Sequence, residues 1–137
     1  IQAAVLLSKF KAFVDYELAD VDKVAGWYTE GLKDTGLVSP EIKEGFYSSW
    51  AQYTIQLPDG VDRKEVQAKL NAAGIPSMVY YAKPMHLQGA FKGTDSAKAD
   101  CPVTEKLCAT VLSLPLDPYK NKDDVDLVIS ELKKAIK

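Results

Sequence analysis

The residues best suited to chemistry lie in one short stretch, residues 80–88. It combines two phenols, an ammonium, an imidazole and an amide, carried by Tyr80, Tyr81, Lys83, His86 and Gln88. Polar groups gathered on a loop that follows a strand are a common way to build a binding site. Tyrosines at a strand end also often only pack, and a single loop histidine is often solvated or bonded to backbone. The residues alone therefore define a candidate binding loop, with a structural role as the alternative.

Other common chemistries lack the residues that they require. The sequence has no glycine-rich phosphate loop, no metal-ligand cluster and no nucleophile motif. Cys101 and Cys108 are too few for a disulfide framework and are not spaced like zinc ligands. We expect free thiols in a reducing cytoplasm, with a reactive nucleophile as the alternative. The net charge of -2 gives no case for nucleic acid or an anionic membrane, and no apolar run approaches the ~18 residues that span a bilayer.

The first part of the chain predicts one long helix over residues 1–33. Its apolar residues recur at alternating steps of three and four, which is the pattern of a helix with one apolar face: Ala3, Leu7, Phe10, Val14, Leu18, Val21, Ala25, Tyr28 and Leu32. Gly36 and Pro40 stop the pattern, and Gly26 and Gly31 predict a frayed last turn. At ~1.5 Å per residue the helix would be about 45 Å long, at least as long as a compact domain of this size is wide.

The first turns of this helix are apolar on every side and not only on one face. Residues 1–7 include only Gln2 as a polar residue. A helix end of this kind needs partners all round, and the rest of the chain can cover only one side. We therefore expect the missing partners to be upstream sequence or another subunit.

The middle of the chain predicts two strands with a helix between them. In residues 50–57 apolar and polar side chains alternate, with Ala51, Tyr53, Ile55 and Leu57 expected to face inward. A turn at residues 58–60 precedes a helix capped by Asp62 and ended by Gly74. The buried face of that helix is expected to hold Val66, Leu70 and Ala73. Residues 77–81 predict a second strand, and residues 82–101 a loop.

The last part predicts a short helix, a strand and a final helix. Pro102 suits the first turn of a helix that runs to about Thr110, and residues 111–114 predict a third strand. Asn121 is expected to cap the last helix, with acidic residues near its start and lysines near its end. Its inward face would hold Val125, Val128, Ile129, Leu132 and Ile136.

This order of elements predicts an α/β fold of two layers, of the α+β kind. We expect a small, mainly antiparallel or mixed sheet with helices on one face, preceded by the long helix.

Several motifs closely resemble the small domain of the DegT/StrS-type aminotransferases. The resemblance is carried by residues 74–77 (GIPS) and then residues 80–88 (YYAKPMHLQ), and by the opening IQAA, the strand WAQY at 50–53, and the segments CPV at 101–103, LSLP at 112–115 and PY at 118–119. It runs over the whole chain in the family order. Family members are pyridoxal-phosphate enzymes that transaminate nucleotide-linked keto-sugars.

The resemblance implies a division of the chain and a larger parent protein. Residues 1–33 would link the large cofactor domain to residues 34–137, the carboxy-terminal small domain of a fold-type I aminotransferase. The Schiff-base lysine would lie in the large domain upstream, because no lysine here stands in a matching motif. The isolated chain is thus expected to hold no catalytic residue, bind no pyridoxal phosphate and be inactive. The parent is expected to be a cytoplasmic homodimer that uses pyridoxal phosphate, an amino-acid donor such as glutamate and a nucleotide-sugar substrate.

The resemblance also implies roles for three residues of the candidate loop. Tyr80, Tyr81 and His86 match positions that help to wall the sugar-nucleotide site. Relatives often have His at the position of Tyr80, and usually Pro at that of Ala82, whose loss should loosen the loop. These departures leave the sugar specificity open. The alternative function is a free-standing α/β binding or regulatory module that reuses the fold without chemistry.

Overall fold

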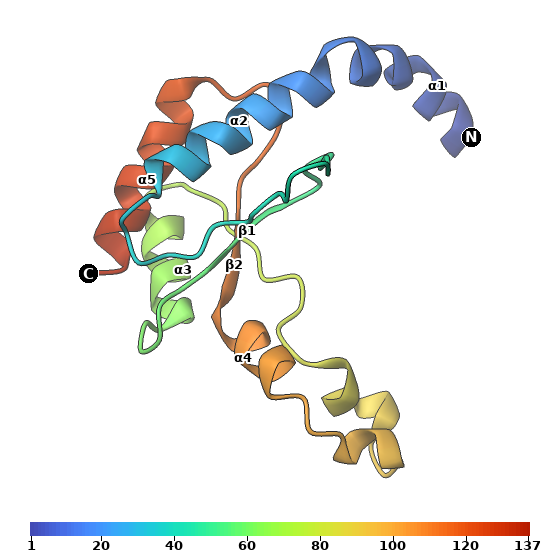
Figure 1. Ribbon diagram of the computed structural model, residues 1–137, viewed down its shortest axis with the longest axis vertical. Helices are drawn as coiled ribbons and strands as arrows, with labels where there is room; N and C mark the ends of the chain where they lie inside the picture. The colour runs from blue at the N-terminus through green and yellow to red at the C-terminus, as the bar shows by residue number, and fades with distance from the viewer.

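The computed structural model describes residues 1–137 as a packed α/β body with two extensions, one formed by the first helix and one by residues 82–110 (Figure 1). The elements in chain order are helix α1 (Gln2–Ala12), the π-helical turn η1 (Phe13–Glu17), helix α2 (Leu18–Gly31), strand β1 (Tyr53–Gln56), helix α3 (Arg63–Ala72), the 3-10 turns η2 (Met85–Leu87), η3 (Gly89–Phe91) and η4 (Asp95–Lys98), helix α4 (Pro102–Thr110), strand β2 (Val111–Leu114) and helix α5 (Lys122–Ala135).

The core lies between one face of the two strands and the three helices α2, α3 and α5. Period-two alternation sends every second strand residue inward. The strands contribute Tyr53, Ile55, Leu112 and Leu114 to the core, and the helices contribute residues such as Tyr28, Leu70 and Leu132. This arrangement confirms the predicted two layers, with the helices on one face of the sheet.

The two strands pair antiparallel, with Tyr53 opposite Leu114 and Gln56 opposite Val111. Single antiparallel bridges extend the pairing on both sides, from Val38 to Gln56 and from Met78 to Ser113. The expected antiparallel sheet is therefore confirmed, although only two strands are regular.

The predicted strand at residues 77–81 is wrong. Only Met78 pairs with β2, through two backbone hydrogen bonds to Ser113 of 3.0 and 2.8 Å. β2 is four residues long, and the chain bends away from it at Tyr80. Met78 and Tyr80 both remain exposed. Val79 packs against the core, but only Met78 of this segment meets the short edge of β2, so no regular strand forms.

The long first helix forms, but it differs from the prediction in two respects. A π-helical turn at Phe13–Glu17 interrupts it, which the apolar pattern did not indicate. The predicted fraying at its end is wrong, because the helix continues to Gly31 and Leu32 is buried. A Cβ atom at Gly31 would lie 2.4 Å from Cδ1 of Ile129 on α5, so that side chain would have to shift. The missing side chain lets the two helices approach closely.

Capping residues set the ends of the other helices as predicted. The Asp62 side chain accepts a hydrogen bond from the Lys64 amide at the start of α3. Asn121 forms a reciprocal capping box with Asp124 on α5. Gly74 has φ +75°, which only glycine adopts without strain, and so closes α3. Two alanines that were expected to face inward, Ala51 and Ala73, are exposed. Ile75, two residues after Ala73, is buried instead.

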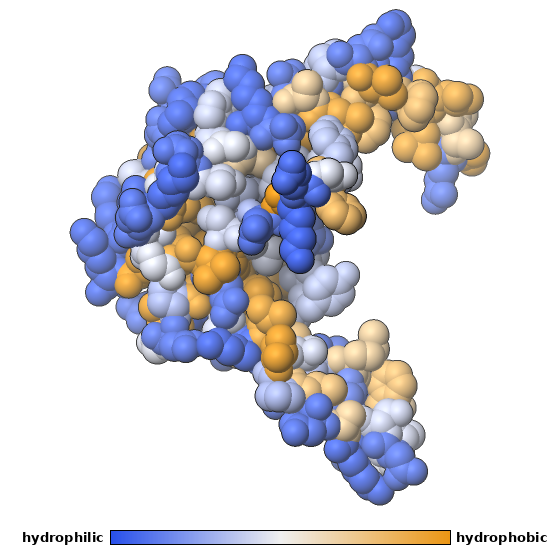
Figure 2. Space-filling view, in the orientation of Figure 1, coloured by the Kyte–Doolittle hydropathy of each residue, from blue (hydrophilic) through white to orange (hydrophobic).

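The two extensions leave apolar surface uncovered. Figure 2 shows apolar atoms gathered over α1, at the amino-terminal end of the molecule. No residue of α1 is buried. The predicted loop at residues 82–101 contains η2, η3 and η4, and together with α4 it leads away from the core (Figure 1). None of the helices is both long and apolar enough to cross a membrane.

Candidate functional site

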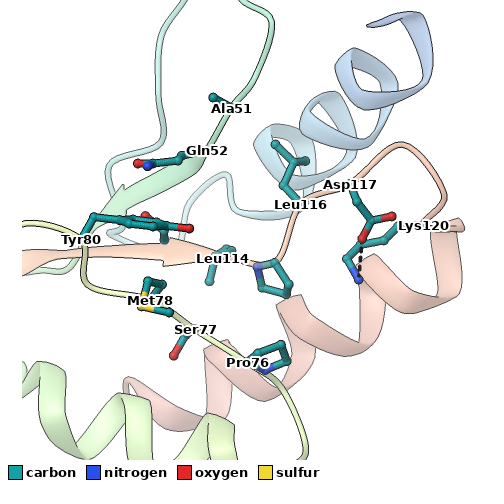
Figure 3. A pocket seen from close by; sticks show the side chains of 12 residues that line it. Ala51, Gln52, Pro76, Ser77, Met78, Tyr80, Leu114, Leu116, Asp117 and Lys120 are labelled. Carbon is teal, nitrogen blue, oxygen red and sulfur yellow. Dashed lines mark ion pairs between the residues drawn. The ribbon is translucent and has the colours of Figure 1, made fainter. Parts of the chain in front are cut away.

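A surface cavity of about 360 Å³ opens on the sheet face that the helices leave uncovered. Its wall is formed by the segment that follows α3, by the end of β2 and by the loop that leads to α5. Figure 3 shows Gln52, Met78 and Tyr80 on one side of this cavity and Leu116, Asp117 and Lys120 on the other. Ser77 and Pro76 lie between them. Residues far apart in the sequence thus meet because β2 crosses the middle of the domain.

The cavity is mixed in character. Its polar atoms include the Gln52 amide, the Tyr80 hydroxyl and the ion pair between Asp117 and Lys120, whose nitrogen and oxygen atoms are 3.4 Å apart. Neither the Gln52 amide nor the Tyr80 hydroxyl has a hydrogen-bond partner within the chain, so both are free to meet a ligand. A wall that combines apolar surface with a few free polar groups is typical of a site for an organic ligand.

The bottom of the cavity is fixed from the core side. The buried Tyr28 hydroxyl donates a 2.8 Å hydrogen bond to the carbonyl of Pro115, which lines the cavity. Burial, and to a smaller extent the nearby negative charge of Asp117, raises the pKa of Tyr28 above its ordinary value of 10. Tyr28 therefore stays neutral and keeps its proton on this bond. On the strand side, the hydroxyls of Thr54 and Ser113 lie 2.8 Å apart across β1 and β2.

The two tyrosines of the candidate loop project from the domain. Tyr80 is 54% exposed and lines the cavity, and Tyr81 is 74% exposed. Tyr81 borders a smaller adjoining hollow of about 60 Å³ together with Tyr80, Thr54 and Val79. Neither ring packs in the core of residues 1–137. For these two residues the structure therefore gives no support to the alternative of a packing role within this domain.

His86 is buried, unlike the two exposed tyrosines of the same loop. Its side chain is only 9% exposed, and its Nε2 atom lies 3.2 Å from Oε1 of Glu105 on α4. Pro84 begins the short turn η2, and the Gln88 amide donates to the carbonyl of Lys83 at 3.0 Å. The histidine thus ties the candidate loop to α4. The structure brings Tyr80 and Tyr81 to the cavity and its rim, but it turns His86 toward Glu105.

Two further side chains attach residues 82–110 to the domain, and no local sequence pattern indicated either of them. Arg63 at the start of α3 donates hydrogen bonds to the carbonyls of Cys108 (2.5 Å) and Val111 (3.1 Å). Lys106 on α4 pairs with Asp59 at 3.0 Å. Arg63 is the only arginine in the sequence, which is the one feature that could have marked it. Gln52, Glu105 and Lys120 were also missed, because their contacts depend on the tertiary fold.

The cavity offers neither a cluster of metal ligands nor an unpaired lysine for pyridoxal phosphate. No group of three or more His, Cys, Asp or Glu side chains could hold a metal ion. Pyridoxal phosphate needs a lysine for its aldehyde and, commonly, a free helix amino terminus for its phosphate. Lys120 is the only lysine of the cavity, and it is paired with Asp117. The neighbouring amino terminus of α5 is closed by its capping box. These residues do not fit the cofactor.

The fold and its motifs define the family of this chain. The profile of the DegT/DnrJ/EryC1/StrS aminotransferase family matches residues 1–133. The chain therefore belongs to this family, and the resemblance in residues 74–88 is confirmed.

Individual relatives agree with the family match. The chain is 37% identical over 132 residues to the UDP-2-acetamido-2-deoxy-3-oxo-D-glucuronate aminotransferase of Pseudomonas aeruginosa, with 96% of this chain and 35% of that protein covered. It is 34% identical over 134 residues to the pleiotropic regulatory protein of Geobacillus stearothermophilus, with 96% of this chain and 35% of that protein covered. The chain thus spans about a third of the length of these relatives.

A solved structure confirms the fold. The crystal structure of a DegT DnrJ EryC1 StrS aminotransferase from Brucella abortus matches with a TM-score of 0.85 and 41% identity. The match covers 98% of this chain and 35% of that one. The α/β architecture described above is therefore that of one part of a larger aminotransferase fold.

Proposed function

We propose that residues 34–137 form the carboxy-terminal small domain of a pyridoxal-phosphate-dependent aminotransferase, and that residues 1–33 link this domain to a cofactor domain upstream. The parent would exchange the carbonyl oxygen of a nucleotide-linked keto-sugar for the amino group of an amino acid, with glutamate as the expected donor. The donor leaves as the corresponding 2-oxo acid, so atoms and charge balance. The observation that carries this proposal is the family match over residues 1–133.

In this proposal the chain supplies one wall of the substrate site. Tyr80 and Tyr81 present free hydroxyls and exposed rings beside a mixed cavity, as the wall of a nucleotide-sugar site requires. We assign them to substrate contact. His86 completes the wall in a different way, because its bond to Glu105 holds the candidate loop in place. The domain would bind and orient the substrate and exclude water, while the cofactor acts as amino-group carrier and electron sink.

The cofactor would be held by residues outside this chain. In the cavity, Lys120 is paired with Asp117 and the start of α5 is capped, which supports this division of labour. The parent would be a homodimer in the cytoplasm, and the two free cysteines are consistent with a reducing compartment. We infer no nucleic-acid or membrane partner.

The test is kinetic and uses the full-length protein. The substrate is a UDP-linked 3-keto-sugar of the type named for the Pseudomonas relative, with glutamate as donor. Tyr81→Phe should leave the melting temperature unchanged and lower kcat/KM roughly ten- to a hundred-fold, because a hydrogen bond to a charged group contributes ~1.5–3 kcal/mol. Tyr47→Phe, which alters an exposed tyrosine that does not line the cavity, is the matched control.

The kinetic result can also reject the assignment. Unchanged kcat/KM in both Tyr81→Phe and His86→Ala would remove the candidate loop from the substrate site. Lost stability with unchanged kinetics would establish the structural alternative for these two residues. If the full-length protein turns over no keto-sugar nucleotide at all, the proposed activity itself is wrong.

A second candidate function is a regulatory protein that has the fold but no turnover. The similarity to the pleiotropic regulatory protein of Geobacillus stearothermophilus favours it. Borohydride reduction of the full-length protein separates the two. An aminotransferase should show one lysine labelled stoichiometrically by pyridoxal phosphate, at a position outside residues 1–137. A regulatory relative without the Schiff-base lysine should show only partial labelling spread over surface lysines.

A further inference from the structure

Three side chains from separate parts of the chain meet beside the π-helical turn. Lys9 on α1 binds the carboxylate of Glu17 and also donates a 2.7 Å hydrogen bond to the hydroxyl of Tyr119. The Tyr119 hydroxyl in turn donates to the same carboxylate oxygen of Glu17. The Lys9 nitrogen lies 5.2 Å from the centre of the Tyr119 ring. We call Lys9, Glu17 and Tyr119 the hinge cluster.

The spacing within the hinge cluster is unusual for a helix. Side chains that meet on a regular α-helix are three or four residues apart, whereas Lys9 and Glu17 are eight apart. On an ideal helix that separation is about 12 Å along the axis. The contact forms across η1, where the π-helical turn changes the twist between α1 and α2. π-Helical turns are rare and frequently lie at functional positions.

The carboxylate of Glu17 is buried although the helix around it is mostly exposed. Glu17 is only 4% exposed. A buried carboxylate is stable only if it is paired and hydrogen-bonded, and here both partners come from outside its own turn. Tyr119 belongs to the loop between β2 and α5, which is fixed to the core by the buried strand and helix on either side.

The hinge cluster is also the main attachment of α1 to the rest of the molecule. Its other side-chain hydrogen bonds stay within α1 and η1, from Ser8 to Val5 and from Lys11 to Asp15. No α1 residue is buried. The helical backbone and the hinge cluster are therefore what holds α1 in place, and the backbone alone allows bending at η1.

We propose that Glu17 is a positioning residue whose carboxylate, bound by Lys9 and Tyr119, fixes the direction in which α1 leaves the packed domain. If the proposed function holds, this direction also sets where the cofactor domain lies relative to Tyr80 and Tyr81. The direction itself is a property of residues 1–137 and can be measured without any turnover.

The experiment measures the distance between spin labels at Ser8 and Ser130 by pulsed electron paramagnetic resonance. Both positions are exposed, Ser130 lies on α5, and Cys101→Ser with Cys108→Ala removes the native thiols. The unaltered cluster should give one narrow distance distribution. Glu17→Gln and Tyr119→Phe should each broaden it at least about twofold, because a bond that held α1 is lost.

A matched control and a second variant keep the proposal open to rejection. Lys11→Gln breaks the neighbouring exposed pair with Asp15 and should leave the distribution unchanged. Tyr119→Phe removes only a hydroxyl, so it remains informative if Glu17→Gln fails to fold. Distributions that are unchanged in Tyr119→Phe, or equally broad in Lys11→Gln, would overturn the role of Glu17. Neither result would bear on the aminotransferase activity of the full-length protein.

Discussion

α1 and α2 are parts of one helical segment, yet they differ completely in what covers them. α2 buries Val21, Val24, Ala25 and Tyr28 against the core, whereas α1 buries no residue. Both halves carry the same three-and-four apolar repeat. The repeat therefore shows that a face needs a partner, but not that this chain supplies one. The same contrast separates the sheet core from residues 82–110, where only Pro84, His86 and Cys108 are buried.

The largest effect is expected when a leucine of the covered core and a leucine of the uncovered α1 are each replaced by alanine. Leu132→Ala on α5 empties a fully buried position and should cost about 2–5 kcal/mol of unfolding free energy. Leu7→Ala on α1 should change the same quantity by less than about 0.5 kcal/mol, because Leu7 is exposed. Urea denaturation of both variants measures the difference. Equal losses would mean that α1 is covered even in the isolated chain.

Replacing two glycines of α2 that have different neighbours should change the stability of the fold by a smaller amount. Gly31→Ala places a methyl group against Ile129, so strain should outweigh the gain in helix propensity and destabilise the fold by roughly 0.5–2 kcal/mol. Gly26→Ala meets no atom within 4 Å and should stabilise it by about 0.5–1 kcal/mol. Opposite signs in thermal unfolding are expected. A stabilising Gly31→Ala would show that α2 and α5 do not need the close approach.

The elements that sequence predicts well are those whose signals are local. The start of α4 at Pro102, the cap of α5 at Asn121 and the end of α3 at Gly74 each depend on a few neighbouring residues. The prediction of a strand at residues 77–81 failed because a strand needs a neighbouring strand to pair with, and local sequence does not show whether one is there. β2 is only four residues long, and of this segment it pairs with Met78 alone.

In the candidate site, too, the local features could be predicted from the sequence and the tertiary contacts could not. A cluster of polar residues on a loop was visible in the sequence, and Tyr80 does line a cavity. The partner of His86 in that loop was not visible, since Glu105 lies 19 residues away in the sequence. The π-helical turn and the contact of Lys9 with Glu17 were missed for a different reason, because an apolar repeat carries no information about a polar contact eight residues apart.

The smallest expected effect is a pH dependence confined to α1. Hydrogen bonds from Lys9 and then Tyr119 lower the pKa of the Glu17 carboxyl below its ordinary value of 4.5. A lowered pKa in the folded state means that the contact is fully present above pH 4.5 and is lost as the pH falls through the lowered value. Lys9 stays charged throughout, because Glu17 and Tyr119 raise its pKa. Tyr16 is the remaining neighbour of the Tyr119 hydroxyl.

Acidification should therefore broaden the distance between labels at Ser8 and Ser130 before the core unfolds, as followed by tryptophan fluorescence. Glu17→Gln should be broad at every pH and show no such transition. A transition of equal size in the Gln variant would assign the effect to other carboxyl groups.

The most direct test of the account is hydrogen exchange of the 137-residue chain alone and within the full-length protein. We propose that α1 and the Tyr80–Tyr81 surface are covered by residues outside this chain. Exposed apolar side chains gain about 1 kcal/mol or more each on burial, so amides in residues 1–7, which precede the hinge cluster, should exchange rapidly in the isolated monomer and at least about tenfold more slowly in the full-length protein. Amides of β1 and α5 should be protected in both. Strong protection of residues 1–7 in a monodisperse monomer, or equally fast exchange there in the full-length protein, would contradict the claim.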